Sequence, residues 1–384
     1  MINTILTEEQ KVFRDTLRNF ARKEVIPYQE KNPLSDGVFP WEQIKLYNKI
    51  GLMGLLVPEE YGGMGGKTME LVIAMEELGR AGCFLPPLTH FGAQRCIVHF
   101  GTDEQKKKYL PPVAAGDVIA AYGQTEPMAG SDAAAMKTTA MLDGNEYVLN
   151  GRKCFITGAP VASTFVVLAK TDPTIAKKAL GISAFIVEKG STGFSTGKPE
   201  KKMGSHSVPT SDLIFENCRI PKDNLLVSQG DGFKRLMGSF NVERCGNTAI
   251  CVGRAEFAFD KALQYSKERE TFGKLISQHQ GIQWMLAQMA VRIKRARLLL
   301  YDAAYKESHG VNVVKDAAMA KMNANEDMVQ LISDAMQIFG GYGYMEDYKL
   351  EATYRDTRGL AFGGGTPQML RSRIAAELLR GNVD

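Results

Sequence analysis

The chain has 384 residues, of which 44% are hydrophobic and 23% are charged. This composition is typical of soluble globular proteins, and the length allows two or three domains. The formal net charge is only +4, and the positive residues are dispersed along the chain. We therefore expect no nucleic-acid partner. No apolar run is long enough to span a bilayer, so we expect no membrane insertion.

The six cysteines form neither a CxxC pair nor a pattern with histidines that is typical of a metal site. We expect free, buried thiols in a reducing compartment and no metal. The first 25 residues predict an amphipathic helix of mixed charge. They lack the apolar core of a signal peptide and the acid-poor composition of a transit peptide. We expect a bacterial cytoplasmic protein or a processed enzyme of the mitochondrial matrix.

Residues 1–120 predict an N-terminal helical domain. Thr7 is the expected N-cap of the first helix because its hydroxyl precedes a helical pattern. Apolar residues at i, i+3 and i+4 continue this periodicity through residues 41–56 and 68–82. Segments rich in glycine and proline separate the predicted helices.

Residues 121–228 predict a middle β domain. Short runs rich in Val, Ile, Phe and Thr are bounded by Gly, Asn and Asp, as in the antiparallel strands of a barrel or sandwich. The predicted strands are 146–159, 163–171, 181–190 and 210–220. The dipeptide Asp143-Gly144 is typical of a hairpin turn.

Residues 229–384 predict a C-terminal four-helix bundle, which makes the fold class α+β. The helices are long and amphipathic, and short connections that contain glycine join them. Their predicted ranges are 232–273, 279–308, 311–341 and 366–380.

Three segments group side chains that suit a polar or planar ligand. Residues 122–132 (YGQTEPMAGSD) combine hydroxyls, free backbone amides and a proline turn, which suits a phosphate or a ring edge. An ordinary capped turn is the alternative. Residues 269–274 (RETFGK), followed by Gln280, place a cation, a hydroxyl and an aromatic ring at the end of a long helix. Residues 337–344 (QIFGGYGY) place small residues where a planar ligand can approach.

These segments, together with 152–159 (RKCFITGA), occur in the order and approximate spacing of the acyl-CoA dehydrogenase family. The chain resembles this flavoprotein family over essentially its whole length. The resemblance implies an N-terminal helical domain, a middle β domain and a C-terminal helical bundle. It also implies FAD, an acyl-CoA substrate, a homo-oligomer that is usually a tetramer, and an electron-transferring flavoprotein as oxidant.

The resemblance also implies roles for individual residues. Those at the isoalloxazine are Gln124, Thr125, Phe155 and Thr157, with Thr157 near N5, and the site is completed by Thr366 and Gln368. The pyrophosphate and adenine are held across a subunit interface by Arg269, Thr271, Phe272, Gln280, Gln337 and Gly341. The acyl-CoA is contacted by Ser131, Asn241 and Arg244. Simple core packing is the alternative role for Phe155 and Phe272.

The implied reaction removes a proton alpha to a thioester and passes a hydride from the beta carbon to flavin N5. It needs a positioned carboxylate and hydrogen-bond donors to the thioester oxygen. Many family members carry the base as Glu at the position of Gly364, which has no proton acceptor but whose backbone N–H can donate. The isovaleryl- and long-chain-type members instead carry it at the position of Glu243, so Glu243 and Gly364 match as a pair.

Two other roles for Glu243 remain open: a solvated helix residue and a salt-bridge partner of Arg244. The expected position near a helix start favours the carboxylate form and lowers its basicity, and burial must offset this effect.

Three features depart from the family pattern. Gln124 stands where an aliphatic residue is usual, and Ala352 replaces a basic residue. The segment 83–91, which helps to form the floor of the acyl pocket, is shorter than in straight-chain enzymes, so we expect a branched, cyclic or otherwise unusual acyl group. Within it, His90 is either a polar pocket residue or a structural histidine.

The sequence therefore predicts an FAD-dependent acyl-CoA dehydrogenase that forms a 2,3-enoyl-CoA, with Glu243 as the base. Three enzymes of the same fold are alternatives: an enoyl-CoA reductase, an acyl-CoA oxidase and a cyclic acyl-CoA dehydrogenase acting at a remote carbon. A helical binding protein that retains FAD without catalysis is a further alternative.

Overall fold

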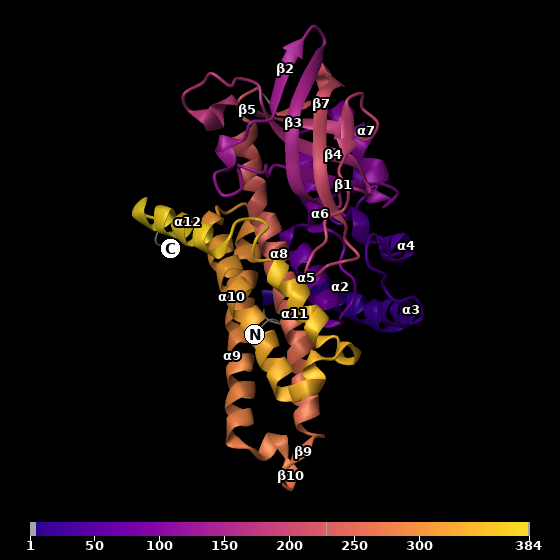
Figure 1. Ribbon diagram of the computed structural model, residues 1–384, viewed down its shortest axis with the longest axis vertical. Coiled ribbons are helices and arrows are strands. Elements are labelled where there is room, and N and C mark those ends of the chain that lie inside the picture. The colour runs from indigo at the N-terminus through magenta and orange to yellow at the C-terminus, as the bar shows by residue number, and fades with distance from the viewer. Residues whose placement is uncertain (1–4, 228, 383–384) are drawn as a thin grey trace.

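A computed structural model describes residues 5–227 and 229–382. Figure 1 shows a sheet at one end of the molecule, short helices beside it, and long helices that run to the opposite end. The helical, β, helical order of the chain agrees with the predicted fold class. Residues 1–4 of the predicted N-terminal helix lie outside the described residues.

The N-terminal helices begin at hydrogen-bonded caps. The Thr7 hydroxyl accepts a hydrogen bond from the Gln10 amide at 3.2 Å, which confirms the predicted N-cap. The helix predicted over 41–56 ends at Asn48 because Gly51 has φ +71° and turns the chain into a short 3-10 segment. The α-helices of this region are α2 (Glu8–Phe20), α3 (Ile26–Lys31), α4 (Trp41–Asn48), α5 (Thr68–Arg80), α6 (Leu88–Phe100) and α7 (Asp103–Ala114).

The middle domain is an eight-stranded sheet with the order β6-β7-β3-β2-β4-β5-β8, and β1 pairs with β4. Most pairs are antiparallel as predicted, but β4 pairs in parallel with both β1 and β2. Gly144, with φ +61°, makes the tight turn between β2 and β3. The strands are β1 (Ile119–Gly123), β2 (Thr139–Asp143), β3 (Glu146–Thr157), β4 (Ala162–Lys170), β5 (Ile182–Glu188), β6 (Phe194–Thr196), β7 (Thr210–Pro221) and β8 (Leu225–Val227).

A bulge in β3 turns one aromatic side chain out of the sheet. The pairing of β3 with β7 shifts register between Lys153 and Ile156. Within this shift, Phe155 has φ +58°, and 67% of the residue is exposed. A positive φ is uncommon for an aromatic residue. The bulge therefore departs from regular strand geometry at the residue whose side chain it exposes.

The described residues of the C-terminal region form five α-helices. The helix predicted over 232–273 ends at Ser266, and the small hairpin of β9 (Glu270–Thr271) and β10 (Lys274–Leu275) follows it. This hairpin turns at Phe272 and Gly273, both with positive φ. The helices are α8 (Gly232–Ser266), α9 (Gln280–Ser308), α10 (Val314–Phe339), α11 (Leu350–Gly359) and α12 (Pro367–Leu379).

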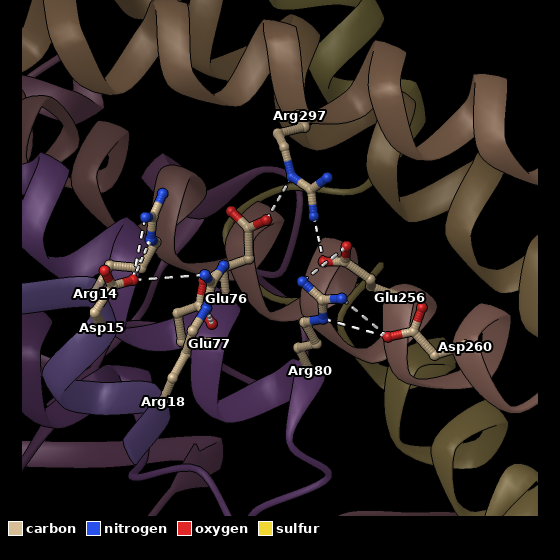
Figure 2. Close-up of polar contacts among 9 residues, drawn as sticks. All are labelled: Arg14, Asp15, Arg18, Glu76, Glu77, Arg80, Glu256, Asp260 and Arg297. Carbon is tan, nitrogen blue, oxygen red and sulfur yellow. Dashed lines mark hydrogen bonds and ion pairs between the residues drawn. The ribbon is translucent and has the colours of Figure 1, made fainter. Parts of the chain in front are cut away.

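A partly buried ionic cluster joins the N-terminal helices to the C-terminal bundle (Figure 2). Arg297 on α9 binds Glu76 on α5 and Glu256 on α8, and all three side chains are at most 15% exposed. Close packing accompanies the charges, since a Cβ at Gly253 of α8 would overlap the carbonyl oxygen of Glu76. The other members of the cluster are Arg14, Asp15, Arg18, Glu77, Arg80 and Asp260.

Three findings on the described residues concern membrane spans, metal sites and cysteines. None of the helices they form has the length and apolar character needed to cross a bilayer. These residues include no group of three or more His, Cys, Asp or Glu side chains arranged to hold a metal ion. All six cysteines are free and buried, as predicted.

Candidate active site

Glu243 and Gly364 lie next to each other in the folded chain. Glu243 projects from α8, and Gly364 belongs to the loop between α11 and α12. Gly364 has φ +69°, and a Cβ built on it would lie 3.6 Å from Glu243 Oε1 and 3.4 Å from Lys321 Cε. A side chain longer than a methyl group would therefore enter the space between the loop and the carboxylate.

The Glu243 carboxylate has no hydrogen bond or ion pair to any residue in the described part of the chain. The side chain is partly buried. Burial raises the pKa of Glu243, and the charges of Lys321 and Arg244 offset part of this rise. A desolvated carboxylate with a raised pKa is a stronger base than one in water.

The expectation that a helix start influences Glu243 is wrong. Helix α8 begins at Gly232, about three turns before Glu243, and the field of a helix terminus acts mainly within its first turn. Burial therefore sets the direction in which the pKa of Glu243 shifts, and the helix start does not oppose it.

Arg244 faces the loop instead of forming a salt bridge with its neighbour Glu243. Its Nε donates to the Gly364 carbonyl oxygen at 3.2 Å, and its Nη1 donates to Asn241 Oδ1 at 2.9 Å. The two residues predicted to contact CoA thus also position the loop that lies against Glu243.

The predicted flavin residues of the middle domain converge at the end of β1 and the bulge of β3. The Cys154 amide donates to the Thr125 carbonyl oxygen at 2.8 Å, and this bond joins the two segments. The Tyr122 hydroxyl donates to Gln124 Oε1 at 3.1 Å. Thr157 ends β3, where its carbonyl oxygen accepts from the Thr89 hydroxyl at 3.1 Å.

A buried ion pair holds the loop that follows β1. Lys153 Nζ donates to Glu126 Oε1 at 2.7 Å. The Glu126 carboxylate also accepts from the backbone amides of Lys137 and Thr138, at 2.6 and 3.0 Å. The loop closes around this carboxylate and leaves Ser131 exposed at its tip.

Three family models match consecutive parts of this chain. They describe the N-terminal, middle and C-terminal domains of acyl-CoA dehydrogenases and match residues 7–117, 121–218 and 230–379. The chain belongs to the acyl-CoA dehydrogenase family. It is an oxidoreductase that acts on CH–CH bonds, and its cofactor is FAD.

Two relatives with similar sequence identity to this chain have names that describe opposite directions of reaction. The chain is 45% identical to an acryloyl-CoA reductase (NADH) of Anaerotignum propionicum, over 98% of this chain and 95% of the relative. It is 43% identical to an acyl-CoA dehydrogenase of Bacillus subtilis, over 98% and 99% of the two chains.

A solved structure shares the whole fold. It was described as the "Electron transferring flavoprotein of Acidaminococcus fermentans: Towards a mechanism of flavin-based electron bifurcation". One of its chains superimposes with a TM-score of 0.92 at 43% identity, covering 98% of this chain and 99% of that chain.

In this member of the acyl-CoA dehydrogenase family, the predicted FAD residues form two separate groups. One group lies near Glu243, where Phe362, Thr366 and Gln368 help to line a cavity of about 340 Å³. Thr366 is also the N-cap of α12. The polar ends of Thr366 and Gln368 at this open cavity fit the polar edge of a flavin.

The other group lies at the far end of the bundle, around β9 and β10 (Figure 1). Phe272 is 94% exposed there, and the rings of Tyr265 and Phe339 stack at 4.1 Å, which brings the ends of α8 and α10 together. The predicted residues of this group are Arg269, Thr271, Phe272, Gln280, Gln337 and Gly341. The end of α8, where the hairpin begins, lies about 35 Å along the helix from Glu243.

Residues of the segment 83–91 lie at two different sites in the structure. Leu88 lies against α8 beside Glu243, since a Cβ on Gly246 would be 2.8 Å from Leu88 Cδ2. Cys83, Phe84 and Leu85 instead line a separate cavity of about 320 Å³, together with Arg254 and Ala352.

His90 is a structural histidine. It is fully buried, its Nδ1 accepts from the Ala120 amide at 3.1 Å, and its Nε2 lies 3.1 Å from the Met53 carbonyl oxygen. Burial lowers the pKa of His90 to about 4, so the ring is neutral at neutral pH.

A polar network beneath the Gly364 loop, made of Asn247, Lys321 and Asn325, was not predicted from the sequence. A signal was present: Lys321 and Asn325 are four residues apart in a helical stretch rich in alanine and methionine, so both lie on one face. The two are buried in the structure, and Lys321 is 0% exposed.

Proposed function

We propose that this protein is an FAD-dependent enzyme that converts an acyl-CoA thioester to a 2,3-enoyl-CoA, with Glu243 as the base that removes the alpha proton. The observation that supports this proposal is the partly buried Glu243 carboxylate, without a hydrogen-bond partner in the described chain, beside the bare backbone at Gly364. The resemblance to isovaleryl- and long-chain-type members predicts the base at this position.

Each part of the site has a role in this proposal. Glu243 takes the alpha proton, and its desolvation makes it a stronger base. The loop backbone at Gly364 donates an N–H to the thioester oxygen, where negative charge develops. Arg244 holds this loop through the Gly364 carbonyl oxygen. When bound, FAD supplies the hydride acceptor.

Glu243→Gln tests the proposal. The amide keeps the shape of the side chain but accepts a proton far more weakly, so we expect FAD content to be unchanged and kcat to fall by at least ~10²-fold. Glu42→Gln, at an exposed glutamate of α4, is the control and keeps wild-type kcat. Wild-type turnover by the Glu243→Gln protein would rule out the assigned base.

Reduction of an enoyl-CoA is the second candidate function, because the relative from Anaerotignum propionicum is an acryloyl-CoA reductase. Anaerobic mixing separates the two directions and surveys the acyl group. Bleaching of the flavin by one of a panel of straight, branched, cyclic and dicarboxylic acyl-CoAs supports dehydrogenation. Reoxidation of reduced protein by enoyl-CoAs, without bleaching by any saturated thioester, supports the reductase.

We also propose an electron-transferring flavoprotein as the redox partner. The structure described as the electron transferring flavoprotein of Acidaminococcus fermentans contains a chain with this fold, which supports the proposal. Turnover that needs this flavoprotein or an artificial acceptor supports the proposal. Rapid turnover with oxygen alone, with release of peroxide, would instead support an acyl-CoA oxidase.

We propose further that the chain assembles as a homo-oligomer, with a tetramer expected. The two groups of FAD residues in one chain are too far apart for one cofactor, so a second copy is needed to bring them together. An apolar stripe on α9, formed by Trp284, Val291, Leu298 and Tyr305, repeats every seventh residue and is exposed. Such spacing is typical of a helix that packs against another helix.

A further inference from the structure

Lys321 of α10 is fully buried beneath the loop that carries Gly364. Its Nζ donates to Asn325 Oδ1 at 2.7 Å, to the Gly365 carbonyl oxygen at 3.0 Å and to the Leu360 carbonyl oxygen at 3.3 Å. All three partners are acceptors. Because a neutral amine has only two N–H groups, this set of partners fits the charged ammonium, which has three.

Two asparagines fix the network in one orientation. Asn247 of α8 donates to the Leu360 carbonyl oxygen at 3.0 Å, and its Oδ1 accepts from Asn325 Nδ2 at 3.0 Å. Asn325 is therefore oriented with its oxygen toward Lys321. The two ends of the 360–365 loop are thus bound to α8 and α10 through three side chains.

Lys321 is also close to the Glu243 carboxylate. A Cβ on Gly364 would lie within 3.4 Å of Lys321 Cε and 3.6 Å of Glu243 Oε1, so the bare glycine separates the cation from the carboxylate. No hydrogen bond joins the two groups in the described chain, and the ammonium protons are all used elsewhere. The interaction between Lys321 and Glu243 is therefore electrostatic, acting through space at short range in a desolvated site.

We propose that Lys321 is a positioning residue of the reaction: it holds the Gly364 loop against Glu243, and its buried positive charge keeps the Glu243 carboxylate ionised and ready to accept the alpha proton. The proposal rests on the proposed function, in which Glu243 is the base. It assigns two separable effects to one side chain, a geometric effect on the loop and an electrostatic effect on the base.

The other charged and titratable groups near Glu243 do not replace this cation. Arg244, on the same helix, is the second positive charge, while Cys96 on α6 and Tyr122 on β1 are neutral groups. Burial lowers the pKa of Lys321 to about 8, which still leaves most of it charged at pH 7. Burial raises the pKa of Glu243, and of the two cations Lys321 has the larger opposing effect.

The sign of the expected pH effect follows from this balance. Glu243 must be unprotonated to act as the base, so kcat/KM falls as pH decreases through its pKa. Loss of the Lys321 charge removes an effect that lowers this pKa. The acid limb of the kcat/KM profile therefore moves to higher pH, by about one unit for a close opposite charge.

Two substitutions separate charge from geometry. Lys321→Gln removes the charge but keeps an amide that donates to the loop carbonyls, whereas Lys321→Met removes both. We expect both variants to shift the acid limb of kcat/KM upward by about one pH unit. We expect only Lys321→Met to raise KM and lower the melting temperature as well, because it leaves the Leu360 and Gly365 carbonyl oxygens without the Lys321 donor.

Asn247→Leu is the matched control. It removes a donor to the Leu360 carbonyl oxygen while the Lys321 charge stays in place, so the melting temperature falls but the acid limb keeps its wild-type position. If the Lys321 variants do not fold, Asn325→Asp serves instead. It places a carboxylate against Lys321, which counters the charge and moves the acid limb to higher pH.

The outcomes distinguish this inference from the proposed function. An unchanged acid limb in Lys321→Gln, Lys321→Met and Asn325→Asp overturns the electrostatic role even while Glu243→Gln is inactive, and the base assignment then stands alone. An equal shift in Asn247→Leu also overturns it, because loop displacement then explains the effect. Wild-type turnover by Glu243→Gln overturns both proposals.

Discussion

Gly364 shows how a missing side chain shapes the site at the scale of one residue. Its φ of +69° is a conformation that glycine adopts readily and other residues adopt at a cost. Any side chain there would enter the space between Lys321 and Glu243. A glutamate at both 243 and 364 would place two carboxylates together, which is why the two positions are best considered as a pair.

Gly364→Ala tests this role of the glycine. The added Cβ is strained by the positive φ, at about 1–2 kcal/mol, and it meets Glu243 and Lys321. We expect a lower melting temperature and a fall in kcat of at least ~10-fold, because the strained backbone shifts the loop that lies against Glu243.

Gly363→Ala is the control for this prediction, since φ at Gly363 is not positive and a Cβ there meets nothing within 4 Å. It keeps wild-type kcat and stability. Equal effects of the two substitutions would contradict the argument from the conformation of Gly364.

At the scale of the elements, charged side chains join helices that are far apart in the sequence. Arg297 of α9 contacts Glu76 of α5 and Glu256 of α8 (Figure 2). Burial opposes the charge on Arg297, but Glu76 and Glu256 more than offset it and raise its pKa. This cluster therefore also fixes α8, the helix that carries Glu243.

Arg297→Met is expected to destabilise the protein strongly. It leaves the Glu76 and Glu256 carboxylates partly buried without their shared cation, at a cost of about 3–5 kcal/mol. Denaturant unfolding measures this change. The double substitution Arg297→Met with Glu76→Gln recovers part of the loss because it removes one of the unpaired charges.

Lys45→Met in α4 is the control, because Lys45 and Glu42 form an exposed ion pair. It leaves the unfolding midpoint unchanged. A midpoint for Arg297→Met that equals that of the control would show that the cluster contributes no net stability.

At the scale of the whole molecule, α8 extends from the sheet to the hairpin at the opposite end (Figure 1). Its length separates Glu243 and Gly364 from the hairpin that carries several of the predicted adenine and pyrophosphate residues. This geometry favours a cofactor site that two copies of the chain complete, and it predicts that assembly and FAD retention depend on each other.

Leu298→Glu tests this dependence. The charge falls within the apolar stripe of α9, so we expect dissociation of the oligomer and loss of FAD together. Light scattering after size-exclusion chromatography measures the mass, and flavin absorbance measures the retained cofactor.

Leu142→Glu, on the exposed part of β2, is the control and keeps both mass and flavin. Monomers of the Leu298→Glu protein that retain full FAD would refute the shared cofactor site.

Much of the fold could be predicted from the sequence, because periodicity and turn chemistry act locally. The Thr7 cap, the turn at Gly144 and the helical, β, helical order all follow from neighbours along the chain. Helix boundaries were less accurate. The segment 232–273 shows helical periodicity throughout, yet the chain leaves the helix after Ser266 to form a hairpin.

The candidate site was also predicted from the sequence in part, and the remainder depended on the tertiary structure. The resemblance to isovaleryl- and long-chain-type members of the family predicted Glu243 and Gly364 as a pair, and the two residues are close together in the structure. Only the tertiary structure decided that burial, and not a helix start, controls the basicity of Glu243, and that Lys321 and two asparagines support the loop. The reason is physical: desolvation and through-space charge depend on which distant segments pack together, and no local pattern in the chain records those distances.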